Sequence, residues 1–219
     1  MITLPASVLR VLLITDGLGD APRLLRIVRA GLQAGVRAVQ IREPLWSARE
    51  LIAFADCLRP EVAAVRGILL VNDRCDVVAA GHADGVQCGF RSLSPAAARK
   101  VVGKDRLVGY SAHDGAQIAE AAAAGCDFAL LSPVWPSSSK PGAKPLGVER
   151  AVLLTRAATL PLLWLGGVSV ERVAQLALLP TKHRPIGVAV RGGICEATDP
   201  HKAALSYVSA AALVFCQQS

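Results

Sequence analysis

Eight short apolar segments alternate with amphipathic segments along almost the whole chain, and this alternation constrains the fold more than any other feature. The apolar segments lie at 8–15, 38–42, 67–71, 85–89, 107–111, 128–132, 162–165 and 186–190. Each has the length of one strand, and several are apolar throughout, as strands covered on both faces are. The amphipathic segments predict helices at 22–34, 47–58, 75–80, 94–102, 114–124, 147–157, 169–178 and 200–215. The pattern therefore predicts repeated strand–helix units that build a parallel sheet.

Two parallel architectures fit such a pattern, an open doubly wound sheet and a closed (β/α)8 barrel. A doubly wound sheet usually carries a glycine-rich phosphate loop after its first strand, and ITDGLGD at 14–20 is not that fingerprint. The glycine pairs Gly166-Gly167 and Gly192-Gly193 instead follow the seventh and eighth apolar segments, where barrels bind phosphate. Eight units in 219 residues give about 27 residues each, close to the roughly 250-residue barrel. We predict an α/β fold, a TIM barrel that forms a single domain over 1–219.

The composition excludes several classes of protein. A hydrophobic content of 53% with only 19% charged residues argues against a disordered chain. No apolar run approaches the ~18 residues of a membrane helix, and Arg10 and Asp16 interrupt the N-terminal apolar stretch, so we expect a cytoplasmic protein. The net charge of +7 is spread singly along a chain with 4% aromatic residues, which favours small phosphorylated ligands over nucleic acid. The six cysteines form no CxxC pair and predict no metal site.

Polar side chains stand where the predicted strands end, and in a barrel these ends face the active site. Gln40 and Arg42 are two residues apart, so they point to the same side of their strand. The Arg42 guanidinium offers a planar donor fork for a phosphate or carboxylate, and a salt bridge to Glu43 or Asp73 is the alternative. His113 is the only histidine at a predicted strand end, and its imidazole can accept and return a proton near neutral pH.

One long irregular segment, 133–146, separates the sixth apolar segment from the next predicted helix. It contains four prolines, two lysines and three serines. Loops of this length in compact folds are often functional. Lys140 follows Ser137, Ser138 and Ser139 directly, so this loop could close over a phosphate with hydroxyl donors and one cation.

Seven motifs in order resemble the thiamine phosphate synthase superfamily, which includes the TenI-type thiazole tautomerases. They are VQIRE (39–43), VNDRCDVV (71–78), ADGVQCGFRS (83–92), VGYSAH (108–113), SPVWPSSSKPG (132–142), LGGVS (165–169) and GVAVRGGI (187–194). The resemblance covers nearly the whole chain. It implies a barrel enzyme of thiamine biosynthesis that binds a thiazole phosphate, and it implies a homo-oligomer, most simply a dimer.

Two positions in the magnesium pyrophosphate site depart from the synthase pattern. The lysine that contacts pyrophosphate in the family is Pro44 here. The family holds magnesium with two aspartates, of which Asp73 matches the first, while Ser92, preceded by Arg91, stands at the second. A serine hydroxyl is a poor substitute for a carboxylate that binds a hard cation. These losses predict an impaired site for magnesium pyrophosphate beside a largely preserved site for thiazole phosphate.

We therefore interpret the chain primarily as a thiazole tautomerase-like isomerase that needs no cofactor and aromatises a thiazole carboxylate phosphate, with His113 moving the proton. The first alternative is a thiamine phosphate synthase, which would join hydroxymethylpyrimidine pyrophosphate to thiazole phosphate with Mg²⁺ on Asp73. The second is a non-catalytic regulatory protein that binds thiazole phosphate.

Arg191 and Gly192 replace a hydrophobic residue and a serine of the family, so we expect the Arg191 side chain to strengthen phosphate binding. The predicted substrate-binding residues are Gln40, Arg42, Asn72, Ser111, Ser137, Ser139, Lys140, Gly166, Gly167, Arg191, Gly192 and Gly193.

Overall fold

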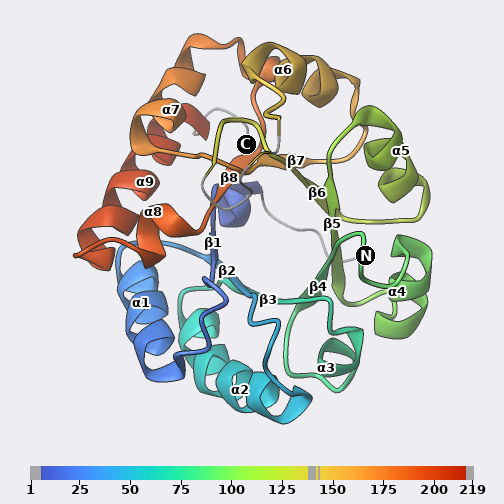
Figure 1. The fold of residues 1–219 in the computed structure, drawn as a ribbon, viewed down its shortest axis with the longest axis vertical. Coiled ribbons are helices and arrows are strands. Elements are labelled where there is room, and N and C mark those ends of the chain that lie inside the picture. Colours follow the sequence, from blue (N-terminus) through green and yellow to red (C-terminus); the bar gives the residue numbers. More distant parts are fainter. Residues whose placement is uncertain (1–5, 138–141, 143, 216–219) are drawn as a thin grey trace.

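Eight parallel strands close into a barrel in the computed structural model, which describes residues 6–137, 142 and 144–215 (Figure 1). Each strand pairs with the next one along the chain, and β8 pairs with β1 to complete the ring. The strands are β1 (Val11–Ile14), β2 (Ala38–Ile41), β3 (Ile68–Asn72), β4 (Gly85–Cys88), β5 (Leu107–Ala112), β6 (Phe128–Leu131), β7 (Leu162–Trp164) and β8 (Gly187–Val190). The α/β TIM barrel predicted from the sequence is confirmed.

Helices surround the barrel and connect its strands (Figure 1). The α-helices are α1 (Ala21–Gln33), α2 (Ala48–Ala64), α3 (Cys75–Ala79), α4 (Pro95–Val102), α5 (Gly115–Ala123), α6 (Val148–Ala157), α7 (Val170–Gln175), α8 (Gly192–Cys195) and α9 (Pro200–Phe215). Short 3-10 helices are η1 (Ala6–Leu9), η2 (Leu176–Leu178) and η3 (Thr181–His183). Side-chain caps fix several starts; Ser47 and Glu50 form a capping box at α2, for example. No helix in the described ranges is both long and apolar enough to cross a membrane.

Two elements differ from the sequence prediction. The first strand begins at Val11, because the start of the predicted segment forms η1. Helix α2 continues past the predicted end at residue 58 to Ala64, although Pro60 lies inside it. Val62 beyond the proline is buried, so packing against the barrel outweighs the low helix propensity of proline.

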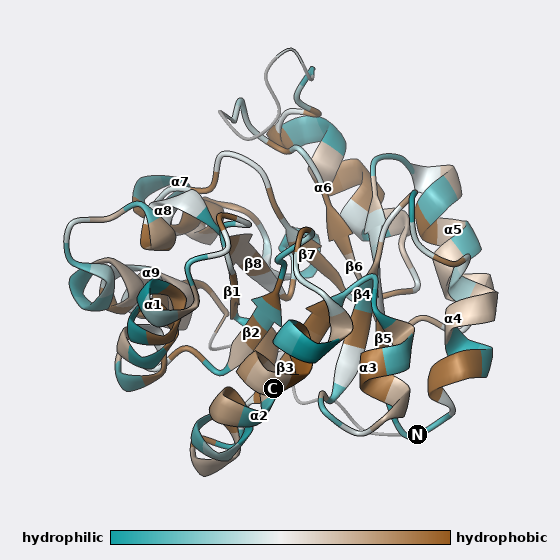
Figure 2. Cartoon of the chain, turned by 60° about the horizontal axis from the view of Figure 1, so that its bottom comes forward, coloured by the Kyte–Doolittle hydropathy of each residue, from teal (hydrophilic) through white to brown (hydrophobic). Residues whose placement is uncertain are grey.

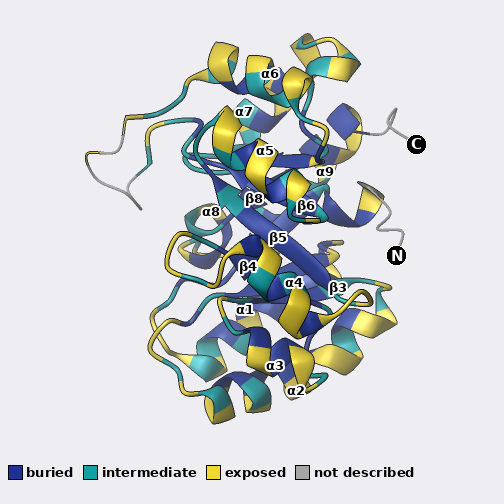
Figure 3. Ribbon diagram, turned by 90° about the vertical axis from the view of Figure 1, so that its right-hand side faces the viewer, coloured by how far each residue is buried: buried dark blue, intermediate teal, exposed yellow. Residues whose placement is uncertain are grey.

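The core has two parts that the strands separate. Strand side chains that point outward pack under the helices, while those that point inward fill the barrel, with Leu12, Leu70, Phe128 and Leu163 among them. Figure 3 shows the strands as buried and the outer faces of the helices as exposed. In Figure 2 the strands are mainly hydrophobic and the hydrophilic residues gather on the helices and loops.

The inward positions become polar toward the carboxyl ends of the strands. Side chains alternate between the two faces of a strand, so every second residue points into the barrel. Ala38 and Leu70 lie in the interior cluster, and the residues two positions further along these strands are Gln40 and Asn72. The corresponding residue after β8 is Arg191, two positions beyond Ala189 of the interior cluster. The fold thus places a polar layer directly above an apolar floor at one end of the barrel.

Candidate active site

Buried amide side chains form the central part of the polar layer. The Nε2 atom of Gln40 donates to Oδ1 of Asn72 at 2.9 Å, and that of Gln87 donates to Oγ of Ser111 at 3.0 Å. Within the described residues, the buried Oε1 atoms of Gln40 and Gln87 have no hydrogen-bond partner. A buried acceptor without a partner costs about 1–3 kcal/mol. A ligand with N–H donors at the barrel mouth would remove this cost.

Arg42 and Glu43 follow β2, and their side chains differ in their contacts. The buried Glu43 carboxylate accepts hydrogen bonds from the backbone N–H groups of Gly17 at 3.0 Å and Gly19 at 2.9 Å. It therefore ties the loop after β1 to the end of β2. The Arg42 guanidinium has no hydrogen bond and no ion pair within residues 6–137, 142 and 144–215. Neither Glu43 nor Asp73 therefore neutralises its charge.

Asp73 lies just after β3 with a φ of 63°, a left-handed conformation that few residues other than glycine adopt. Its Oδ2 atom accepts from Nδ2 of Asn72 at 2.6 Å, and its Oδ1 atom accepts from the Ser92 hydroxyl. That hydroxyl itself accepts from the Gly89 N–H group at 2.6 Å. Backbone strain of this kind is concentrated at functional sites. The carboxylate is thus held in place between the ends of β3 and β4.

The donors around Asp73 fit a metal ion that arrives with its substrate. The described part of the chain contains no cluster of three or more His, Cys, Asp or Glu side chains that could hold an ion by itself. Mg²⁺ usually takes one or two protein carboxylates, substrate phosphates and several waters. Asp73 supplies one hard carboxylate, and Ser92 supplies only a hydroxyl that is already bonded to it. The residues present therefore fit Mg²⁺ as a one-carboxylate site.

His113 is oriented by the main chain at the end of β5. Its Nδ1 atom lies 2.5 Å from the Ser132 carbonyl oxygen, and its backbone N–H donates to Oε1 of Gln117 at 2.8 Å. Because a carbonyl can only accept, Nδ1 carries a proton, and Nε2 of the neutral ring is an acceptor. The Nε2 atom of the half-buried ring is therefore available as a hydrogen-bond acceptor.

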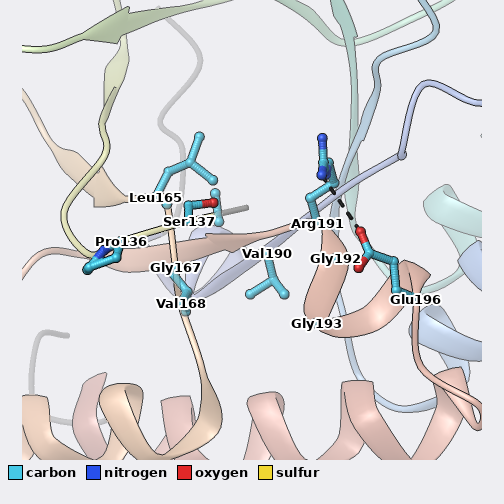
Figure 4. A pocket seen from close by; sticks show the side chains of 12 residues that line it. Pro136, Ser137, Leu165, Gly167, Val168, Val190, Arg191, Gly192, Gly193 and Glu196 are labelled. Carbon is cyan, nitrogen blue, oxygen red and sulfur yellow. Dashed lines mark ion pairs between the residues drawn. The ribbon is translucent and has the colours of Figure 1, made fainter. Parts of the chain in front are cut away.

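A pocket of about 250 Å³ lies between the ends of β7 and β8, and we call it the glycine pocket (Figure 4). In Figure 4, Ser137 and Gly167 lie on one side and Arg191 and Glu196 on the other. It is lined by Pro136, Ser137, Leu165, Gly166, Gly167, Val168, Ala189, Val190, Arg191, Gly192, Gly193 and Glu196. The N–H groups of Ile194 and Cys195 both donate to Arg191 O, so those of Gly192 and Gly193 precede the first hydrogen bond of α8.

The glycine pair after β7 allows a close approach of the loop that follows β6. Gly166 and Gly167 have φ angles of 92° and 65°. A Cβ atom on Gly167 would lie 2.2 Å from the Pro136 carbonyl oxygen, and Trp135 N donates to Gly166 O at 3.1 Å. Residues 133–137 therefore pack directly on the end of β7 and complete one wall of the glycine pocket.

Position 193 requires a glycine for a different reason, the close approach of the Tyr207 side chain, and this gives a testable expectation. A Cβ atom there would lie 2.2 Å from the hydroxyl oxygen of buried Tyr207, which donates to Val168 O at 3.1 Å. We expect Gly193→Ala to lower the free energy of unfolding by about 1–3 kcal/mol, the usual cost of overpacking. Urea unfolding measures this effect. Gly89→Ala is the control, since a Cβ atom there meets nothing within 4 Å; an equal loss in both variants would contradict the explanation.

Cys195 ends the short helix α8 and does not act as a nucleophile. Its thiol is buried and donates to Ile14 O at 3.4 Å. Burial raises the pKa of Cys195 to about 12, so the thiol is protonated near neutral pH. Because the thiolate is the reactive form, the group has a structural role.

The predicted site residues fall into two groups at the carboxyl end of the barrel. Gln40, Arg42, Asn72, Asp73, Ser111 and His113 stand on β2, β3 and β5 or directly after them; Ser137, Gly166, Gly167, Arg191, Gly192 and Gly193 line the glycine pocket. Ser139 and Lys140 lie outside the described residues. The sequence prediction omitted Gln87 and Glu43. Gln87 lies near the end of β4 and Glu43 lies two residues after β2, so both are polar residues where an apolar segment ends, a signal that the sequence contains.

A family model and curated relatives show one family, and a solved structure shows the same fold. A family model described as thiamine monophosphate synthase matches residues 11–194. A putative thiamine-phosphate synthase from Geobacter sulfurreducens is 34% identical over 182 residues, which cover 83% of this chain and 84% of the relative. A thiamine-phosphate synthase from Roseiflexus castenholzii is 33% identical, with 92% and 88% covered. The solved thiamine phosphate pyrophosphorylase from Pyrococcus furiosus superposes with a TM-score of 0.84 at 24% identity, covering 95% of this chain and 98% of that one.

The interpretation as a thiazole tautomerase is wrong in light of these relatives, which are named as synthases. It rested on reading Pro44 and Ser92 as the loss of magnesium pyrophosphate binding. An ion that arrives with a diphosphate needs only one or two protein carboxylates, so the change at Ser92 does not by itself remove such a site. The synthase alternative is the better supported one.

Proposed function

Because this chain belongs to the thiamine monophosphate synthase family, we propose that it is a transferase that joins hydroxymethylpyrimidine diphosphate to thiazole phosphate. In this reaction a C–N bond forms between the thiazole nitrogen and the pyrimidine methylene carbon. The C–O bond to the diphosphate breaks, and the diphosphate leaves with the electron pair. The observation that carries the proposal is the position of two separate groups of residues suited to bind anions at the barrel mouth, one around Arg42 and Asp73 and the other in the glycine pocket.

The diphosphate is proposed to bind at the ends of β2 and β3. Arg42 brings a guanidinium with no protein partner among the described residues, and this group matches a phosphate with two parallel hydrogen bonds. Asp73 would hold Mg²⁺, which when bound neutralises the diphosphate and stabilises it as a leaving group. Arg91 adds a further positive charge on the loop after β4. These charges offset the absence of the family's lysine at Pro44.

The heterocycles are proposed to bind over the amide layer and beside the glycine pocket. The unpartnered Oε1 atoms of Gln40 and Gln87 suit the amino group of a pyrimidine, which donates hydrogen bonds. The phosphate of the thiazole substrate would enter the glycine pocket, where Arg191 and the backbone N–H groups of Gly192 and Gly193 are available. His113 stands directly after β5 with Nε2 as an acceptor.

A condensation assay on the purified protein tests the proposal. We expect thiamine phosphate to form from the two substrates only when Mg²⁺ is added. Asp73→Asn should raise the Mg²⁺ concentration for half-maximal rate by about tenfold or more, since a carboxylate that binds a hard cation is replaced by a neutral amide. Asp76→Asn is the matched control, because Asp76 pairs with Arg74 at the surface. Binding of thiazole phosphate without condensation would refute the transferase and favour a regulatory protein.

A further inference from the structure

We propose that the Glu196 carboxylate occupies the phosphate position of the glycine pocket in the ligand-free protein and must move away from Arg191 before a phosphate can bind. The proposal rests on the proposed function only in assigning a substrate phosphate to this pocket. It adds a competing side chain that regulates entry and selects the ligand by its charge.

The first support is the position of Glu196 directly after α8. Its side chain lines the pocket, and its Oε1 atom lies 3.7 Å from a terminal guanidinium nitrogen of Arg191 (Figure 4). A Cβ atom built on Gly192 would lie 2.8 Å from the same Oε1 atom. The carboxylate therefore covers the face of Gly192 that the pocket needs for an anion.

The second support is the incomplete pairing of Arg191. At 3.7 Å the ion pair with Glu196 is longer than the 2.7–2.9 Å of a charge-assisted hydrogen bond. Its Nε atom is buried and has no partner among the residues that the structure describes. Arg191 therefore keeps hydrogen-bonding capacity that one carboxylate does not use, while a phosphate with three terminal oxygens could use it.

The third support is the freedom of Glu196 to leave. Its side chain is 60% exposed, whereas that of Arg191 is 25% exposed. A loose ion pair at the surface contributes little, so the carboxylate can swing into solvent at small cost. Arg191 stays in the pocket wall and remains available. A phosphate that carries more charge than a carboxylate therefore displaces Glu196, while a weak monoanion competes poorly.

Gly192 fits the same explanation. Its φ angle is not in the left-handed region, and the atoms nearest to a Cβ there all belong to the Glu196 carboxylate. The family pattern resembled by this chain has a serine at this position. A serine side chain would push the carboxylate out, so Gly192 and Glu196 belong together as one arrangement. We expect Gly192→Ser to separate Glu196 from Arg191.

Titration with inorganic phosphate tests the inference without any turnover. Trp135 packs against Gly167, which lines the pocket, so its fluorescence can report binding, and calorimetry gives an independent dissociation constant. Glu196→Gln should bind phosphate about fivefold more tightly, the scale of one partly exposed charge interaction. Arg191→Ala should bind at least about tenfold more weakly, because a charged hydrogen bond is lost. Glu120→Gln, exposed on α5, should match the wild type.

The outcomes test the role of Glu196 separately from the proposed transferase function. An unchanged or weaker affinity in Glu196→Gln would overturn the inference, because Glu196 would then be a bystander or a positioning residue. Absence of any phosphate binding to the wild type would overturn it as well, even if the condensation assay succeeds. Tighter binding in Glu196→Gln combined with no condensation would support the inference and refute the transferase.

Discussion

Arg42→Ala is expected to lower kcat/KM for the pyrimidine diphosphate by about 100- to 10,000-fold. The guanidinium has no protein partner among the described residues, so its hydrogen-bonding capacity is available to a ligand. Each hydrogen bond to a charged group contributes about 1.5–3 kcal/mol, and a planar fork makes two of them to one phosphate. The backbone at Arg42 stays anchored in the variant, because its N–H donates to the Thr15 hydroxyl at 2.8 Å regardless of the side chain.

Steady-state kinetics with each substrate varied in turn measure this effect. The KM for thiazole phosphate should change little, because its phosphate is assigned to the glycine pocket. Arg42→Lys provides the matched variant: it keeps the charge but loses the fork, so an intermediate loss is expected. A decrease of less than about fivefold in Arg42→Ala, or an equal effect on both substrates, would show that the diphosphate does not bind at the end of β2.

The barrel was predictable because buried parallel strands leave an unmistakable pattern. Each strand is covered on both faces, so Phe128–Leu131 and its counterparts appear as short continuous apolar runs that helical segments separate. The polar residues at strand ends were predictable for the same reason, since Gln40 and Asn72 follow directly from the position of each run. The ends of helices and strands were harder to predict where packing outweighs local helix propensity, as Pro60 inside α2 shows.

The contacts of Glu196 could not be predicted in the same way. It follows a helix of four residues, which is too short to show a periodic pattern. Its contact with Arg191 depends on how the turn after β8 folds back over Gly192. Nothing in the spacing of the residues encodes this direction.

The interpretation of function was wrong because each change in a residue of the metal diphosphate site was judged by itself. The changes at Pro44 and Ser92 were taken as the loss of a metal diphosphate site. In the structure Arg42 remains unpaired within the described residues and Asp73 is held by Asn72 and Ser92. When the substrate supplies some of the ligands of the ion, the strength of ion binding depends on the total charge that the protein presents. A comparison of motifs does not measure this charge.

Trp164→Ala is expected to lower the free energy of unfolding by about 3–5 kcal/mol, the usual cost of removing a buried aromatic ring. Trp164 is fully buried on β7, and its Nε1 atom donates to the Thr155 hydroxyl on α6 at 2.9 Å. Its ring also meets Trp135 edge to face with centroids 5.8 Å apart. The variant should therefore also weaken phosphate binding, because Trp135 supports the wall of the glycine pocket.

Urea unfolding followed by circular dichroism measures the stability, and Trp164→Phe separates the two contributions of the side chain. Phenylalanine keeps most of the volume but cannot donate, and the Thr155 hydroxyl still donates to Ala151 O at 2.8 Å. The Phe variant should therefore lose only about 1–2 kcal/mol, since one hydrogen bond and a small volume disappear. Similar losses in both variants would mean that the hydrogen bond to α6, rather than the packed ring, holds this side of the barrel together. Because Trp135 meets the ring itself, phosphate affinity should follow the loss of ring volume: nearly normal in Trp164→Phe and reduced in Trp164→Ala.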